Sequence, residues 1–168
     1  MAAALMVAAA EARAQEQARA GNLRRIVISI PQRRLALLVE GQVIRIYPVA
    51  VGAASSPSPT GTYTLVERLA NPTWYHPGKV VPPGRDNPLG TRWLGLSRKG
   101  YGIHGTNRPR SIGRPVSHGC IRMRNSDVED LYGLIAVGDT VELHGQRDPE
   151  LDRIFHPEPV TFASAGGQ

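Results

Sequence analysis

The chain has 168 residues, of which 41% are hydrophobic, and it carries a formal net charge of +6. This length suits one globular domain with a real core and leaves no room for two. No apolar run reaches the roughly 20 residues that a membrane helix needs. The positive charge favours an anionic polymer as partner. It does not indicate nucleic acid, because Lys and Arg are scattered and aromatic residues make up only 5%.

The N-terminal 22 residues are interpreted as a leader or a disordered extension. Residues 1–14 resemble an incomplete signal peptide, with a short apolar stretch and a cleavage-like triplet at Ala12-Arg13-Ala14. An Ala-rich helix is the alternative. Export would place the chain in an oxidising compartment, where a single unpaired cysteine needs a reason to exist.

Alternating apolar residues predict that most of the chain is β-structure. Residues 26–51 are expected to form a three-stranded meander with a tight turn at Glu40-Gly41-Gln42 and a last strand over Val43 to Val51. Further short strands are predicted at residues 61–66, 92–97, 100–104 and 140–143.

Residues 70–90 show little periodicity and are rich in proline. A segment this long without regular structure is uncommon in a small domain and indicates a lid or binding loop, with a plain surface connection as the alternative. Trp74 and Tyr75 in this segment would form a substrate platform if exposed, or anchor the loop if buried.

One helix is predicted to start at Ser126, because Ser126 and Glu129 have the spacing of a capping box. Apolar residues then recur at helical spacing, and Gly138 ends the segment. Residues 145–168 lack periodicity and are interpreted as a frayed tail.

The single cysteine, Cys120, follows Ser117-His118-Gly119, and these neighbours suit a reactive thiolate rather than an inert buried thiol. A histidine must then accept the thiol proton. Two histidines are candidates: His118, two residues away, and His104, at the end of a predicted strand. We favour His104, and we expect a backbone carbonyl such as that of Gly105 to hold its other ring nitrogen.

The residues around Cys120 suggest how a negatively charged intermediate or substrate would be bound. Gly119 permits a backbone turn that directs consecutive N–H groups at one point, as an oxyanion requires. Arg122 has the forked geometry that pairs with a carboxylate, or it forms an ordinary salt bridge. Zinc is the competing explanation for the histidines and Cys120, but their spacing does not match the paired ligands of common zinc sites.

These motifs resemble the signature of the L,D-transpeptidase family with the YkuD-like catalytic domain. The resemblance rests on His104-Gly105-Thr106 followed by Ser117 to Arg122, on Pro59 to Tyr63, and on Pro82 to Arg92. It extends from about Ile26 to Leu143. It implies a β-sandwich-like fold with mixed sheets and a long lid-like loop, formed by residues 23–145 as catalytic domain, with residues 146–168 as a C-terminal tail.

The resemblance also implies an activity on peptidoglycan in the periplasm or cell wall. Cys120 would attack the diaminopimelate–D-Ala bond of a stem tetrapeptide, with His104 as proton acceptor and donor. Ser117, His118 and Gly119 would shape the site and its oxyanion hole, and Arg122 would bind substrate. The residue pattern described above adds Gly105 as an orienting residue and Trp74 and Tyr75 as substrate-binding residues. The acyl group would pass to an amine of a neighbouring stem or to a lipoprotein lysine, without metal or cofactor. Carbapenems would acylate the same thiol. Water as acceptor, giving a carboxypeptidase or amidase, and a non-catalytic wall-binding module remain alternatives.

Overall fold

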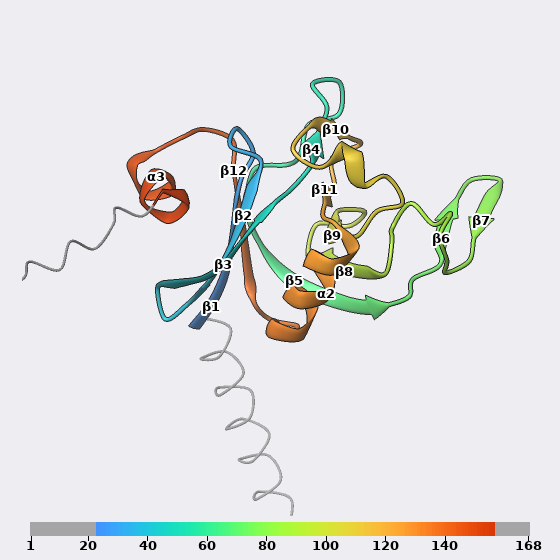
Figure 1. The fold of residues 1–168 in the computed structure, drawn as a ribbon, viewed down its shortest axis with the longest axis horizontal. Helices are drawn as coiled ribbons and strands as arrows, with labels where there is room; N and C mark the ends of the chain where they lie inside the picture. The colour runs from blue at the N-terminus through green and yellow to red at the C-terminus, as the bar shows by residue number, and fades with distance from the viewer. Residues whose placement is uncertain (1–22, 157–168) are drawn as a thin grey trace, which may run out of the picture.

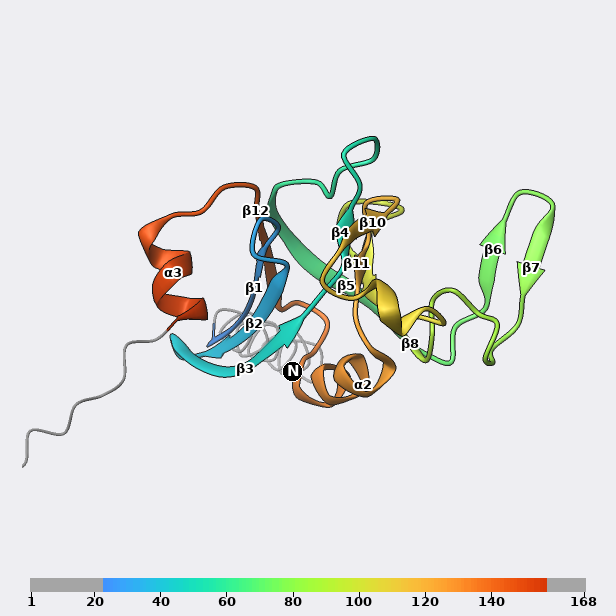
Figure 2. The ribbon, with the colours of Figure 1, turned by 45° about the horizontal axis from the view of Figure 1, so that its top comes forward.

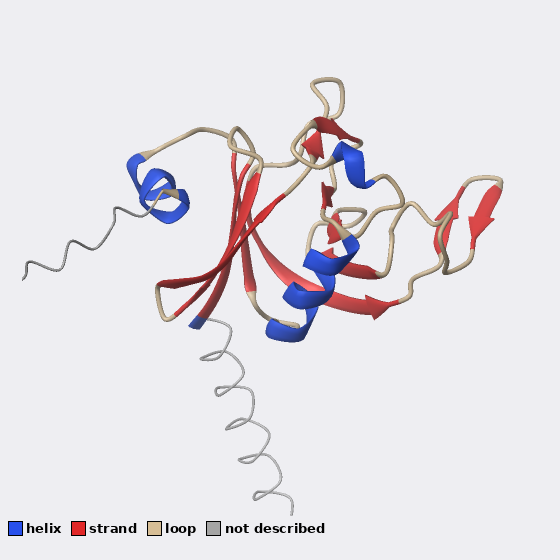
Figure 3. Cartoon of the chain, in the orientation of Figure 1, coloured by secondary structure: helices blue, strands red, loops and turns tan. Residues whose placement is uncertain are grey.

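The computed structural model describes residues 23–156. Within this part of the chain most regular structure is β, with two α-helices and one short 3-10 turn (Figures 1 and 3). The predicted fold class, mostly β with one or two helices and mixed strand directions, is confirmed. The predicted leader, residues 1–22, and the end of the tail, residues 157–168, lie outside the described residues.

The N-terminal meander forms as predicted from the alternating pattern. Strands β1 (Arg24–Ser29), β2 (Arg34–Val39) and β3 (Gln42–Pro48) pair antiparallel in sequence order. The third strand is shorter than predicted, because the chain changes partners after Pro48. The Ala50 N–H donates to the carbonyl of Arg122, and β4 (Val51–Gly52) pairs in parallel with β10 (Pro115–Ser117). The end of the meander thereby reaches the segment before Cys120.

The main sheet has eight strands in the order β11-β9-β8-β5-β12-β1-β2-β3 and curls around one core (Figure 1). The strands not yet given are β5 (Gly61–Ala70), β8 (Arg92–Leu96), β9 (Gly102–His104), β11 (Ile121–Arg122) and β12 (Thr140–His144). β12, the last strand among residues 23–156, lies in the middle of the sheet, parallel to β1 and antiparallel to β5. β11 is parallel to β9.

Strands β1 and β2 are buried on both faces, which explains their nearly continuous apolar sequence. Ile26 and Leu35 belong to the main core, which also includes side chains of β5, β8, β9, β11, β12 and helix α2 (Asn125–Leu134). Val27, Ala36 and Leu38 face the other way, into a second cluster. Strands β1 and β2 therefore contribute side chains to the hydrophobic clusters on both faces of the sheet.

The second cluster is completed by helix α3 (Pro149–Phe155), in a region that was predicted to be a frayed tail. That prediction is wrong for these residues. Leu151, Ile154 and Phe155 are buried against β1 and β2, and the Asp148 carboxylate caps the helix by accepting from the Leu151 N–H. With seven residues the helix is too short to show a clear periodicity in sequence.

Helix α2 forms as predicted, but it ends at Leu134 rather than at Gly138, and the predicted capping box does not form. The helix begins at Asn125 with Arg124 at the N-cap position, and no side chain caps its first turn. The Ser126 hydroxyl instead donates to the Asp127 carboxylate. The side chain of Asn125 has another use, described below.

The predicted lid-like segment contains a small hairpin that the sequence did not indicate. Strands β6 (Trp74–His76) and β7 (Lys79–Val81) pair antiparallel and form a separate two-stranded sheet that projects from the body (Figure 2). The rest of the segment is held by Asn87, whose buried side-chain amide donates to the carbonyls of Pro72 and Pro82. Among residues 23–156, no helix is long and apolar enough to cross a membrane.

Candidate active site

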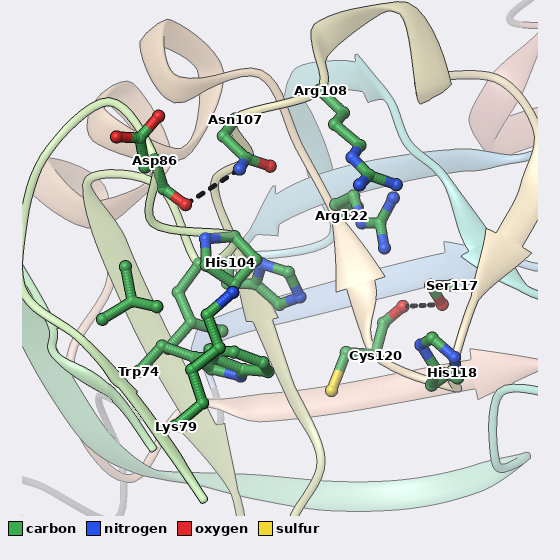
Figure 4. Close-up of a pocket in the computed structure, with 13 residues that line it drawn as sticks. Trp74, Lys79, Asp86, His104, Asn107, Arg108, Ser117, His118, Cys120 and Arg122 are labelled. Carbon is green, nitrogen blue, oxygen red and sulfur yellow. Dashed lines mark hydrogen bonds between the residues drawn. The ribbon is translucent and has the colours of Figure 1, made fainter. Parts of the chain in front are cut away.

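A cavity of about 390 Å³ lies between the end of the main sheet and the β6–β7 hairpin, and thirteen residues line it (Figure 4). Six of the residues singled out in the sequence are among them: Trp74, His104, Ser117, His118, Cys120 and Arg122. The only cysteine of the chain and the favoured histidine therefore open into the same space.

The pairing of β9 with β11 brings these two side chains to one face. In the register of the two parallel strands Arg122 lies beside His104, and Cys120 precedes Arg122 by two residues. Cys120 itself lies in the bend directly before β11. The strand pairing therefore brings His104 and Arg122 together with the bend that carries Cys120, and all three residues line the cavity, although 16 positions separate the histidine from the cysteine in the sequence.

His104 is buried and held in one tautomer. Its Nδ1 lies 2.6 Å from the carbonyl oxygen of Gly105. A carbonyl can only accept, so Nδ1 carries the proton and Nε2 is left with a lone pair. The ring also stacks on Trp93 with centroids 5.9 Å apart. Burial lowers the pKa of His104 to about 4, assisted by the nearby charge of Arg122 and opposed by the Gly105 hydrogen bond.

Cys120 is partly buried, and burial raises the pKa of its thiol above the ordinary value. A backbone hydrogen bond from Gly102 and the charge of Arg122 act in the opposite direction but are weaker. The sulfur lies 3.7 Å from the carbonyl oxygen of Gly100, to which a thiol can donate. At neutral pH the resting pair is thus a thiol and a neutral imidazole, which differs from the resting thiolate that the flanking residues suggested.

Ser117 fixes the turn that carries the cysteine. Its hydroxyl donates to the Cys120 carbonyl at 2.6 Å and accepts from the Gly119 N–H at 3.1 Å. Gly119 has a φ of +113°, and a Cβ there would meet the ring of Tyr101 at 2.7 Å. The predicted need for glycine is therefore explained by conformation and close packing. The Gly119 N–H itself is engaged by Ser117 and is not directed at the cavity.

Asn125, at the first position of α2, was missed in the sequence and supports the histidine segment from behind. Its Oδ1 accepts from the Thr106 N–H at 2.9 Å and from the Thr91 N–H at 3.3 Å. The same oxygen lies against Gly105, where a Cβ would approach it to 2.2 Å. Asn125 thus ties the strand end at His104 to the helix and to the loop before β8. Only the tertiary contact reveals this role.

Arg122 is half-buried, and its Nη1 donates to the Ser111 hydroxyl at 3.3 Å. Its Nε is buried without a hydrogen-bond partner among the described residues. Burial lowers the pKa of Arg122, as does the positive charge of Arg108. The alternative interpretation of Arg122 as an ordinary salt-bridge residue does not fit, because no carboxylate of residues 23–156 lies within salt-bridge distance of it.

The two aromatic residues of the hairpin, Trp74 and Tyr75, lie in different environments, because the side chains of adjacent residues on a strand point to opposite sides. Trp74 lines the cavity and stacks on His76 with centroids 5.2 Å apart. Tyr75 is 75% exposed and is not among the lining residues, so it does not anchor the loop, and its role in substrate binding stays a prediction. His118 is exposed at the cavity rim.

The cavity also contains charged and polar residues that the sequence did not single out. Lys79 comes from the hairpin, Asp86 from the following loop, and Asn107 and Arg108 from the segment directly after His104-Gly105-Thr106. The Asn107 amide donates to the Asp86 carbonyl at 3.0 Å and so joins the two loops (Figure 4). The only feature of the sequence that could have assigned Asn107 and Arg108 to the site is their position directly after the histidine motif.

The residues that were weighed as zinc ligands do not converge. His76 lies on the hairpin, and in the described part of the chain no three His, Cys, Asp or Glu side chains gather as a metal site would require.

Comparison with known proteins adds an independent result. Residues 23–143 match the family described as YkuD, the L,D-transpeptidase catalytic domain. The putative L,D-transpeptidase YkuD of Bacillus subtilis is 40% identical over 71% of this chain and 65% of its own length. The probable L,D-transpeptidase YbiS of Escherichia coli is 37% identical over 85% of this chain and 54% of its own length. The chain thus spans about half to two thirds of these relatives.

Solved structures agree on the fold. An L,D-transpeptidase from Mycobacterium tuberculosis superposes with a TM-score of 0.62 at 21% identity, covering 73% of this chain and 57% of that one. The C442S mutant of the Enterococcus faecium L,D-transpeptidase gives a TM-score of 0.60 at 20% identity, covering 72% of this chain and 49% of that one.

Proposed function

Since the chain belongs to the YkuD family of L,D-transpeptidase catalytic domains, we propose that it is a cysteine-dependent acyltransferase acting on peptidoglycan stem peptides. The observation that carries this proposal is the shared cavity, which is lined both by Cys120 and by a neutral His104 whose Nδ1 is held by Gly105. A fixed imidazole with a free Nε2 lone pair is what a thiol needs to lose its proton on attack.

In the first half of the reaction Cys120 attacks the carbonyl carbon of the diaminopimelate–D-Ala bond. The thiol proton passes to Nε2 of His104 as the C–S bond forms. The same proton then goes to the nitrogen of D-Ala as the C–N bond breaks, which leaves a thioester and free D-Ala. Because the imidazole returns to neutrality, no buried charge persists between the two halves.

The negative charge on the carbonyl oxygen in this step needs hydrogen-bond donors. The Gly119 N–H already donates to Ser117, so we assign this role to the N–H groups of His118 and Cys120 in the same turn. Arg122 is half-buried and close enough to lower the pKa of Cys120, and it stabilises developing negative charge on the sulfur or a substrate carboxylate.

In the second half an amine attacks the thioester, and the product is a new amide between two stems or between a stem and a lipoprotein lysine. Trp74 covers the cavity from the hairpin and contacts the stem. Peptidoglycan lies outside the cytoplasmic membrane, so the proposal places the protein in the periplasm or cell wall. The predicted leader that would take it there lies in residues 1–22, outside the described part of the chain.

Incubation with a carbapenem followed by mass spectrometry of the intact protein tests the nucleophile. We expect one covalent adduct on the wild-type protein and none on Cys120→Ala. His104→Ala should fold normally and acylate at least a hundredfold more slowly, in keeping with the usual contribution of a general base. An adduct on Cys120→Ala, or unchanged acylation of His104→Ala, would remove that residue from the proposed mechanism.

The identity of the reaction product distinguishes acyl transfer to an amine from hydrolysis by water. With a stem tetrapeptide as donor and an amine acceptor present, we expect cross-linked or amine-exchanged product to exceed the trimmed tripeptide. Tripeptide alone, with acceptor present at millimolar concentration, would instead identify a carboxypeptidase that uses water. No turnover by a protein that is readily acylated by the carbapenem would contradict peptidoglycan as substrate.

A further inference from the structure

A second cavity, of about 550 Å³, adjoins the first on the side of the 3-10 turn Pro109–Ser111. The two cavities share four lining residues: Asn107, Arg108, His118 and Arg122. A molecule seated in the second cavity would therefore have one end next to Cys120, across the shared wall. We call this second space the arginine cavity.

The arginine cavity is lined by four arginines, Arg108, Arg110, Arg114 and Arg122, and by no Asp or Glu. None of these four takes part in a salt bridge with another described residue. Figure 4 shows the guanidinium groups of Arg108 and Arg122 next to one another. Four like charges around one depression repel each other unless an anion enters.

Two features of Arg122 indicate that this anion is an oxyacid bound close to the thiol. Burial lowers the pKa of Arg122, and the neighbouring positive charge of Arg108 lowers it further, which records the repulsion between the two guanidinium groups. In addition, the buried Nε of Arg122 has no hydrogen-bond partner among residues 23–156. A guanidinium normally satisfies such donors with the paired oxygens of a carboxylate or phosphate.

We propose that the arginine cavity binds the carboxylate of the acyl acceptor, so that the enzyme prefers amines that carry a carboxylate on or near the amine-bearing carbon. This inference rests on the proposed transpeptidase function. Once the thioester has formed, the donor occupies the first cavity, and the acceptor must approach from a neighbouring space. A diaminopimelate amine and a free D-amino acid both have the required pair of groups.

The transfer itself balances without a further reactant. The neutral amine of the acceptor forms a C–N bond to the thioester carbon, and the C–S bond breaks with its electron pair left on sulfur. The extra proton of the amine passes through Nε2 of His104 to that sulfur, which restores the thiol of Cys120. The acceptor carboxylate takes no part in bond making. It holds the amine at the thioester, and its charge offsets the repulsion among the arginines.

Arg110→Gln and Arg114→Gln test the proposal, because these two side chains line the arginine cavity and not the first one. The donor is a stem tetrapeptide, and the acceptors are D-methionine and D-methioninamide, which differ only at the carboxyl group. We expect each substitution to raise the KM for D-methionine about tenfold, as loss of one charge-assisted hydrogen bond would. The KM for D-methioninamide and the rate of donor acylation should stay within twofold of wild type.

Arg153→Gln is the matched control. It removes the same charge from an exposed position on helix α3, which Figure 1 shows on the side of the molecule away from the hairpin. It should leave the KM for both acceptors unchanged, which separates a local effect from a change in net charge.

Three results would overturn the inference: an equal rise in KM for the acid and the amide, no rise for either, or slower donor acylation, which would assign the cavity to the donor. Failure of the proposed function looks different. In that case the wild-type protein itself would form no thioester with the tetrapeptide, or would transfer to neither acceptor, and the inference would fall with it.

Discussion

At the scale of single residues, burial changes what a cysteine–histidine pair can do. His104 and Cys120 both lose hydration in the cavity, and both neutral forms are favoured for that reason. The pair therefore does not rest as a thiolate and an imidazolium, as in sites where an adjacent charge dominates. In the proposed mechanism the proton moves during the attack, and the reactivity of the sulfur depends on the position of Nε2 of His104 rather than on a permanent negative charge.

This gives a prediction for the pH dependence of acylation. Neutral His104 is the competent base, and its pKa is lowered to about 4. As the pH falls, the rate constant for acylation by a carbapenem should thus hold level through pH 6 and decline only as the pH passes through about 4. An unperturbed histidine would give this decline near pH 6.5. Stopped-flow or quenched mass measurements between pH 3.5 and 8 would check it.

A half-maximal rate near pH 6.5 or above would show that His104 is better hydrated, or more strongly paired with an anion, than its buried position indicates. Trp93 faces the ring of His104 and is the main source of that burial on one side. Trp93→Ala should accordingly shift the decline of the acylation rate constant to higher pH, while the decline for the wild-type protein stays near pH 4.

At the scale of elements, the β6–β7 hairpin shows how strand geometry sorts neighbouring side chains. Trp74 and Tyr75 are adjacent in sequence, yet only Trp74 lines the cavity. Tyr75 pairs in register with Val80, and both are largely exposed. The hairpin therefore presents one aromatic ring to the site and one to solvent.

Matched substitutions separate these two positions. Trp74→Ala should raise the KM for the stem tetrapeptide about tenfold, because the cavity loses its one tryptophan wall, worth about 1–2 kcal/mol of apolar contact. Tyr75→Ala should leave the KM within twofold. Steady-state kinetics of D-Ala release would measure both. Equal effects of the two changes would mean that the hairpin rotates when substrate binds.

At the scale of the whole molecule, the C-terminal strand holds the two halves of the sheet together. β12 lies between β5 and β1, and its buried side chains Val141 and Leu143 enter the main core. The pairing of β12 with β1 joins segments more than 100 residues apart, since Arg25 is in register with Thr140. Without β12, β1 and β5 would each lose one of their two partner strands, and the exposed edges would remain open.

Truncation tests this arrangement. A chain ending at residue 138 lacks β12 and α3 and should show no cooperative unfolding transition in urea. A chain ending at residue 147 keeps β12 and loses only α3, so it should unfold cooperatively but at lower urea concentration than the full chain. Circular dichroism and fluorescence would follow both transitions. A cooperative transition in the shorter chain would contradict a central structural role for β12.

The elements that depend mainly on neighbouring residues were predicted correctly from the local sequence pattern. The apolar pattern of Ile26 to Val39 predicted the first two strands correctly, although the alternation that was expected gives way to a nearly continuous apolar run, because both faces of these strands are buried. Helix α3 was missed, because its short apolar face can be recognised only from its packing against Val27, Ala36 and Leu38 of the sheet. The capping box at Ser126 was wrong since the helix starts earlier, at the residue that supports Gly105.

The chemical groups of the site can be identified from the amino-acid sequence: one cysteine, a histidine motif before it, and a glycine that its turn requires. Its motif also identified the family. The tertiary structure alone decided which atoms meet, because the cavity is formed by strands and loops that are remote along the chain. The parallel pairing of β9 with β11 sets His104 beside Arg122, and the curled sheet removes water from both the imidazole and the thiol. Burial and strand register depend on long-range packing, which no local pattern encodes.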